Sequence, residues 1–210
     1  MDDLYLSGYQ IIEKDKAMYV EDIKEYRKKE IEILERLNLD QISRAMDAIV
    51  ETWEKDADIY VFGNGGSAAT ASHMVNDFNK GISEKTGKKF RMHCLCDNFS
   101  TVMAIANDSS YEEVFRSQLK GILRKDDLVI GISGSGNSEN VLKAIEYAKS
   151  QNVKTIGITG YDGGKLQKIA DYSMHVPVMN MQITEDIHMF FDHMMMYILS
   201  VRHERLQEER

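Results

Sequence analysis

Two short segments rich in glycine and serine stand out, because each directly follows an apolar run. The first is GNGGSAA, Gly63 to Ala69, and the second is ISGSGNSEN, Ile132 to Asn140. Glycines let several backbone N–H groups, and the positive end of a following helix, point at one anion. The serine hydroxyls add further donors. Both segments therefore predict sites for an anion such as a phosphate monoester, with tight turns and helix caps as the alternative.

A nucleotide is the first alternative ligand. Gly63, Gly65 and Ala68 match a relaxed G-x-G-x-x-A dinucleotide pattern. That pattern expects an acidic residue roughly twenty positions later, whereas Asp97 lies about thirty positions past the glycines. Neither segment ends in the G-K-[ST] of an NTPase phosphate loop. An NAD-type site stays a distant alternative, and a Walker-type site is disfavoured.

Histidines and carboxylates occur near these segments in two places. His73 and Asp77 are four residues apart in the helical pattern after the first segment, so they share one helix face. Such groups in apolar surroundings are either well hydrogen-bonded or functional. Together they predict acid–base chemistry on a phosphorylated small molecule, or a divalent metal such as zinc. Five more candidates interrupt the otherwise apolar run of the last helical pattern: Glu185, Asp186, His188, Asp192 and His193.

The composition limits the class of protein. A chain of 210 residues with 43% hydrophobic content predicts one sizeable core, and its net charge of −8 argues against a nucleic acid partner. The start MDDLYLSGYQ lacks the features of a secretory signal, and the most apolar run is interrupted by Asp192 and His193, so no membrane span is expected. Cys94 and Cys96 are too close on a strand to pair easily. A metal site with His93 is the weaker reading of this segment. We expect a cytoplasmic protein.

The elements that must position these residues follow from hydrophobic periodicity. Two amphipathic helices are predicted over 19–38 and 40–56, with Asp40 as the cap between them. They form an N-terminal helical extension, residues 1–56, that packs onto the domain or another subunit; residues 57–210 form one structural unit.

In that unit short apolar runs alternate with helical patterns, which predicts an α/β fold with a parallel sheet covered on both faces. The polar stretch from Lys80 to Lys89 is read as a surface loop, and the segment between the second strand and Tyr111 as another. In such a sheet a ligand binds at the carboxyl ends of the strands. The predicted strands are 59–62, 90–95, 127–133, 154–159 and 172–176; the predicted helices start at 67, 111, 138, 164 and about 184.

Five motifs occur in an order and spacing that resemble the sugar isomerase (SIS) domain family, and within it the phosphoheptose isomerases. They are GNGGSAATASH, AIANDSSYEEVF, ISGSGNSENVLKAIEYAK, GITGYDGGKL and ITEDIHMFFDH. The resemblance spans roughly residues 20 to 200. It implies a flavodoxin-like, doubly wound parallel sheet, a homotetramer held by helical bundles, and active sites between subunits.

The resemblance also assigns roles to individual residues. The catalytic positions of the family fall on Asp77 and His193. The metal positions, with zinc as the expected ion, fall on His73, Asp77, Glu185 and His193. Glu185 also falls on a substrate position. The remaining substrate positions are Asn64, Gly65, Gly66 and Ser67 for the sugar phosphate, Asn107 and Asp108 for the sugar, and Ser133, Gly134, Ser135 and Ser138 for the phosphate.

Three positions depart from the phosphoheptose isomerase pattern. Asp77 stands where the family has a glutamate that serves as the catalytic base. Glu185 stands where it has a glutamine, and Gly81 where an arginine is common. A carboxylate shortened by one methylene can lower a rate on the order of a hundredfold if it is misplaced by about 1 Å. Conversely, two histidines and two carboxylates form a better cation site than a set with a neutral amide. Glu185 and His193 are eight residues apart, about 12 Å along a helix, which favours a metal site shared between subunits.

The leading hypothesis is an aldose–ketose isomerase that converts sedoheptulose 7-phosphate to D-glycero-D-manno-heptose 7-phosphate through an enediol. An isomerase of another sugar phosphate is one alternative, motivated by Gly81. A non-catalytic SIS module is another, because SAATASH and TGYDGG are also similar to a bacterial SIS protein that binds the replication initiator. Asp77 favours the enzyme.

Overall fold

The computed structural model describes residues 18–208 and divides the chain into two units, 1–36 and 37–210. The first unit contains α1 (Met18–Glu35). Its surface carries ion pairs one helical turn apart, Lys24 with Glu21 at 2.7 Å and Lys29 with Glu25 at 2.6 Å. Exposed pairs of this kind add little to stability, so a helix with this pattern depends on packing for most of its stability.

Helix α2 (Leu39–Glu54) belongs to the second unit, where it packs on strands of the sheet. The structure thus separates α2 from α1 and groups α2 with the sheet. The boundary predicted from the sequence lies later, after residue 56, with both helices in the N-terminal extension. The expectation that Asp40 caps α2 is wrong. Asn38 is the cap, since its side-chain oxygen accepts a hydrogen bond from the Gln41 N–H at 3.0 Å.

The sheet of the second unit is parallel and has five strands in the order β2-β1-β3-β4-β5. This is the flavodoxin-like order, and it confirms the predicted α/β class. Each strand lies within or next to a predicted apolar run. The strands are β1 (Ile59–Gly63), β2 (Met92–Cys94), β3 (Leu128–Ser133), β4 (Lys154–Thr159) and β5 (Tyr172–His175).

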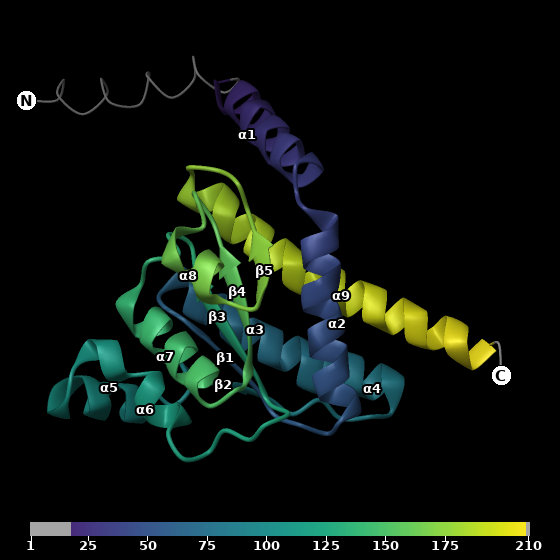
Figure 1. Ribbon diagram of the computed structural model, residues 1–210. Helices are drawn as coiled ribbons and strands as arrows, with labels where there is room; N and C mark the ends of the chain where they lie inside the picture. The colour runs from purple at the N-terminus through teal and green to yellow at the C-terminus, as the bar shows by residue number, and fades with distance from the viewer. Residues whose placement is uncertain (1–17, 209–210) are drawn as a thin grey trace, which may run out of the picture. The chain divides into compact units, whose positions relative to one another are not determined.

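Helices cover both faces of the sheet (Figure 1). Two glycines in register, Gly131 on β3 and Gly157 on β4, let α7 and α8 approach their face closely. A Cβ on Gly131 would lie 2.9 Å from Val141, and one on Gly157 would lie 3.1 Å from Leu166. On this face lie α7 (Glu139–Ser150) and α8 (Gly164–Ile169), and on the other lie α2, α3 (Gly66–Asn76) and α9 (Met181–Glu208).

The segment after α3 is helical, so the expectation of a surface loop over Lys80 to Lys89 is wrong for its first half. A π-helix, η1 (Asp77–Ile82), follows α3 and leads into α4 (Ser83–Thr86). Phe78 and Ile82 are buried and anchor this stretch. The polar residues around them obscure its helical pattern in the sequence. Asp77 is the first residue of this π-helix, and π-helical turns often occur at functional sites.

The region between β2 and β3 also differs from the expectation. The helix α5 (Phe99–Asp108) forms where a loop was expected, capped by Asn98, whose side chain accepts from the Thr101 N–H at 3.1 Å. The expected helix from Tyr111 is broken into η2 (Tyr111–Glu113) and α6 (Arg116–Leu119). The Gln118 amide explains part of the break, because it donates to the Leu95 carbonyl outside the helix as well as to the Val114 carbonyl.

Helix α9 is buried through its centre. It begins three residues before the predicted start, with Asn180 accepting from the Ile183 N–H at 3.0 Å. Ile187, His188 and Phe191 are almost fully buried. Burial lowers the pKa of His188 to about 4. Within residues 18–208 no helix is both long and apolar enough to cross a membrane.

The buried imidazole predicts a specific sensitivity to acid. The unfolded chain binds a proton at His188 near pH 6.5, whereas the folded chain does so only near pH 4. The folded state therefore loses stability as the pH falls from about 6.5 to 4, by roughly 3 kcal/mol for a shift of this size. We expect His188→Phe to remove this part of the pH dependence in urea unfolding between pH 7 and 4.5. An unchanged slope in the variant would show that other groups control acid unfolding.

Candidate active site

The two glycine- and serine-rich segments follow β1 and β3, which are neighbours at the centre of the sheet. The chain order along the sheet reverses at this point, and such a switch point opens a crevice at the carboxyl ends of the strands. One segment runs into α3 and the other into α7. Two helix N-termini therefore start from the same edge of the sheet, as an anion site requires.

Side-chain amides tie the two loops together. Asn64 and Asn140 each donate to the other's oxygen at 2.9 Å. The Tyr111 hydroxyl donates to the Asn64 oxygen at 2.8 Å, so the chain after α5 also reaches this loop. Gly65 has a φ of +54°, a backbone conformation that favours glycine and turns the chain into α3. The first loop is thus held in one conformation by its neighbours.

The second loop is equally ordered. The hydroxyls of Ser133 and Ser138 lie 3.0 Å apart, and the Asn137 amide donates to the Ser135 carbonyl at 2.9 Å. Gly136 has a φ of +64°, and a Cβ there would overlap the Gly163 carbonyl of the loop after β4. Donors that are already fixed in place cost little to organise around an anion.

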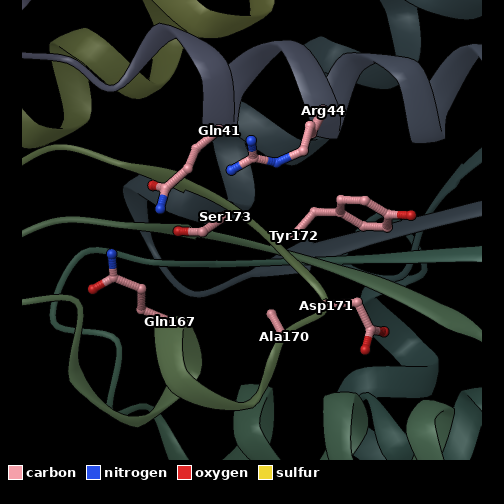
Figure 2. A pocket seen from close by; sticks show the side chains of 7 residues that line it. All are labelled: Gln41, Arg44, Gln167, Ala170, Asp171, Tyr172 and Ser173. Atoms are coloured by element: carbon pink, nitrogen blue, oxygen red, sulfur yellow. The ribbon is translucent and has the colours of Figure 1, made fainter.

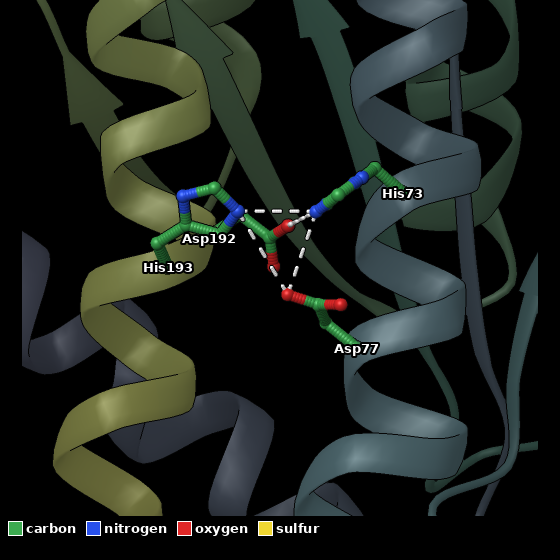
Figure 3. A group of neighbouring side chains, drawn as sticks. All are labelled: His73, Asp77, Asp192 and His193. Carbon is green, nitrogen blue, oxygen red and sulfur yellow. Dashed lines mark hydrogen bonds and ion pairs between the residues drawn. The ribbon is translucent and has the colours of Figure 1, made fainter.

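Four titratable side chains meet where α3 and η1 pack against α9. His73 and Asp77 come from α3 and the first residue of η1, and Asp192 and His193 come from α9 (Figure 3). The Nε2 atoms of the two histidines are 3.1 Å apart, and the His73 Nε2 is 3.5 Å from the Asp77 carboxylate. One ligand atom from each residue lies within 4.8 Å of all the others. We call these four residues the His/Asp cluster.

The His/Asp cluster combines exposed and buried groups. The side chains of His73 and His193 are 42% and 56% exposed, whereas Asp77 is mostly buried and Asp192 is fully buried. Burial, together with the neighbouring charge of Asp77, raises the pKa of Asp192 to about 7. Exposed imidazoles with buried carboxylates next to them can transfer protons to and from a ligand. They can also hold a divalent cation.

The cluster does not contain Glu185. The Glu185 carboxylate lies over Gly66, the first residue of α3. A Cβ on Gly66 would come within 2.5 Å of the Glu185 Oε1. A carboxylate is favoured at a helix N-terminus by the helix dipole. Glu185 therefore lies against the first loop, and its assignment as a metal ligand stays a prediction.

The structure places the other predicted substrate residues at the end of α5 and in the two loops. Asn107 and Asp108 lie exposed at the end of α5, where the Asn107 amide donates to the Asp108 carboxylate at 2.8 Å. The remaining ones are in the two loops already described: Asn64, Gly65, Gly66, Ser67, Ser133, Gly134, Ser135 and Ser138.

Sequence reasoning missed three residues of this region. Asp192 was recognised as unusual but not assigned to the set with His73, although it directly precedes His193. Asn140 and Tyr111 were not singled out, because hydrogen bonds between segments far apart in the chain leave no local pattern. The charged position Asp192 inside an apolar run was the one available signal.

Two other segments have structural explanations. His93 stacks on Tyr60 and bonds to Asp58 at 2.7 Å, while Cys94 and Cys96 are unpaired, so the disfavoured metal reading of this segment gains no support. A Cβ on Gly81 would lie 2.5 Å from the Met196 side chain, so α9 occupies the space beside this position.

A separate cavity of about 180 Å³ lies between α2 and the segment leading into β5 (Figure 2). It is at the amino end of β5, the edge of the sheet opposite the two loops, and it contains none of the predicted site residues. We therefore do not assign the activity to it. Its lining consists of Gln41, Arg44, Gln167, Ala170, Asp171, Tyr172 and Ser173.

Comparisons with known proteins agree with this arrangement. The SIS domain profile matches residues 24–160. The chain is 37% identical to a phosphoheptose isomerase of Helicobacter pylori strain P12, over 82% of this chain and 87% of that protein. It is also 37% identical to a probable phosphoheptose isomerase of Thermoplasma acidophilum, over 82% of this chain and 94% of that one.

A solved structure gives the same result. The phosphoheptose isomerase of Neisseria gonorrhoeae superposes with a TM-score of 0.78 at 28% identity, covering 86% of this chain and 98% of that one. The two proteins are thus similar in sequence and in fold over most of their lengths. The chain belongs to the SIS domain family and, within it, to the phosphoheptose isomerases.

Proposed function

We propose that this protein is an aldose–ketose isomerase that converts sedoheptulose 7-phosphate to D-glycero-D-manno-heptose 7-phosphate. The observation that carries the proposal is that His73 of the His/Asp cluster lies on α3, the helix that starts at the first of the two loops. His73 lies seven residues from Gly66, roughly 10 Å along α3, a span that an extended sugar phosphate can bridge. Membership of the phosphoheptose isomerases supports the substrate.

Each part of the site has a role in this reaction. The loops Asn64 to Ser67 and Ser133 to Ser138 bind the phosphate end, and Asn107, Asp108 and Glu185 contact the sugar. Asp77 takes a proton from one of the two carbons C1 and C2 and returns it to the other, through an enediol. His193, whose ring is within 4.0 Å of the Asp77 carboxylate, donates and accepts the proton of the sugar oxygen.

The same residues suit a divalent cation, which we propose is zinc. Two imidazoles and carboxylates are ligands that zinc prefers, and both oxygens of the buried Asp192 lack a hydrogen-bond partner within the described residues. A bound ion polarises the oxygens of the sugar and so makes the neighbouring C–H bond more acidic. The family pattern assigns the ion to His73, Asp77, Glu185 and His193.

Gly81 favours a second candidate, an isomerase of another sugar phosphate. An arginine is common in the family at this position, whereas Gly81 has no side chain, and a Cβ there would lie 2.5 Å from the Met196 side chain of α9. A pocket without that cation would favour a sugar with fewer anionic or polar groups.

We further propose a cytoplasmic homotetramer with active sites between subunits. Phe190 and Tyr197 on α9 are 40% and 70% exposed, and they flank His193 on one side of the helix. An exposed apolar face next to catalytic groups is suited to a subunit interface. The unpaired cysteines suit the reducing cytoplasm.

The first test measures isomerase activity. Zinc-loaded protein incubated with sedoheptulose 7-phosphate is expected to form the aldose, followed by NMR, and Asp77→Asn is expected to lower kcat by at least a hundredfold because the amide cannot accept the proton. Glu84→Gln, at an exposed position of α4, is the matched control and is expected to keep full activity. No conversion of this sugar, but conversion of another ketose phosphate, would favour the second candidate. No turnover of any sugar phosphate would leave a non-catalytic SIS module.

The second test concerns the phosphate loops. Ser138→Ala removes a hydroxyl donor and its contact with Ser133, so KM is expected to rise about tenfold, the equivalent of roughly 1.4 kcal/mol, with little change in kcat. Ser150→Ala, at the exposed far end of α7, should leave KM unchanged. An unchanged KM for Ser138→Ala would remove this hydroxyl from the site.

The third test concerns assembly. Sedimentation velocity is expected to give a tetramer for the native protein, and Tyr197→Glu is expected to shift it to smaller species because a charge enters an apolar contact. Lys165→Glu, at an exposed position of α8, should not shift it. A monomeric native protein with full activity would contradict the shared active site.

A further inference from the structure

We propose that Tyr111 is a specificity-determining residue, whose hydroxyl oxygen accepts a hydrogen bond from a hydroxyl group of the sugar. The same oxygen keeps the phosphate group of the ligand away from this side of the crevice. This inference rests on the sugar phosphate of the proposed function, and it adds a group that distinguishes the sugar end of the ligand from the phosphate end. The resemblance assigns Tyr111 no role.

The hydrogen bonds around Asn64 have only one consistent direction. The Val141 N–H donates to the Asn140 side chain at 2.9 Å, and because a backbone N–H can only donate, the atom that it meets is the Asn140 carbonyl oxygen. The Asn140 amide therefore donates to the Asn64 oxygen at 2.9 Å, and the Asn64 amide returns a bond of the same length. Both side chains are thereby fixed in one orientation.

This orientation determines where the Tyr111 proton lies. The Tyr111 hydroxyl is 2.8 Å from the Asn64 oxygen, which can only accept, so the single proton of the hydroxyl is committed to Asn64. The Asn64 oxygen accepts from both Tyr111 and Asn140, and thus uses both of its lone pairs. A ligand that reaches this network meets an acceptor at Tyr111 and a donor at Asn64.

Tyr111 is both accessible and held in place. It is 54% exposed, whereas Asn140 is 3% exposed, so a ligand can reach the tyrosine but not the buried amide. The short helix η2, which carries Tyr111, is tied to α7 by Glu113, whose carboxylate lies 3.4 Å from the Lys143 Nζ of α7. The same carboxylate lies 3.0 Å from Arg116. The tyrosine therefore has a defined position at the first loop.

An acceptor at this position distinguishes the two ends of a sugar phosphate. The charged oxygens of a phosphate group accept hydrogen bonds, so the lone pairs of the Tyr111 oxygen repel them. A sugar hydroxyl both donates and accepts, so it can pair with the Tyr111 oxygen and with the Asn64 amide. The phosphate then binds nearer to the second loop, and the sugar extends past Tyr111 toward Asn107 and Asp108, which precede it in the chain.

The test compares the binding of two ligands to the full-length protein by calorimetry: sedoheptulose 7-phosphate and inorganic phosphate. Tyr111→Phe keeps the ring and removes the acceptor, so the Kd for sedoheptulose 7-phosphate is expected to rise about fivefold to tenfold. The Kd for inorganic phosphate is expected to stay within about twofold or to fall, because no bond to phosphate is lost. Tyr147→Phe removes a hydroxyl from α7 but keeps the ring beside Arg116, and this matched control should change neither Kd.

The two ligands separate a contact with the sugar from a structural role. Equal weakening of both ligands in Tyr111→Phe would show that the hydroxyl only supports the first loop, and would overturn the proposal. An unchanged Kd for sedoheptulose 7-phosphate would overturn it as well. Binding is measured without turnover, so a native protein that binds this sugar phosphate but does not isomerise it would count against the isomerase alone. An active native protein whose variant binds both ligands normally would count against Tyr111 alone.

Discussion

The close packing of α9 on the rest of the second unit is the contact on which the site depends. Four glycines on different elements make room for it: Gly66 meets Glu185, Gly81 meets Met196, Gly134 meets Met181 and Gly160 meets Thr184. A side chain at any of these positions would push the helix away. Because α9 carries two of the four groups of the His/Asp cluster, the distance between α9 and α3 sets the distances within the cluster.

The sheet provides the other half of the arrangement. Parallel strands bring the loops after β1 and β3 to one edge, and the reversal of chain order opens that edge to a ligand. The protein has a net charge of −8, yet the ligand that these loops suit is an anion. Fixed backbone N–H groups and hydroxyls resolve this conflict locally, because they present partial positive charge without adding net charge to the chain.

The strands, the two glycine- and serine-rich loops and most helices were predictable because each is encoded in a short run of residues. Ile59 to Phe62 and Gly63 to Ala69 are examples, where apolar residues give way to glycines. The π-helix at Asp77 and the helix that ends at Asp108 were not predictable, since their anchors are contacts with distant segments. The resemblance named His73, Asp77, Glu185 and His193 together. The structure brings three of these into one cluster and leaves Glu185 outside it, and the position of Asp192 beside them depends on the packing of α9 against α3.

The reciprocal amide pair between Asn64 and Asn140 has a consequence for the lifetime of the protein. Each amide uses its donor and its acceptor on the other, so neither can be replaced by a carboxylate without setting two oxygens face to face. Asn64 also precedes a glycine, and asparagine is among the residues that degrade on prolonged heating. Hydrolysis of one side-chain amide would separate the two halves of the crevice while leaving the core intact. Slow chemical ageing at this one position would thus loosen the crevice without unfolding the protein.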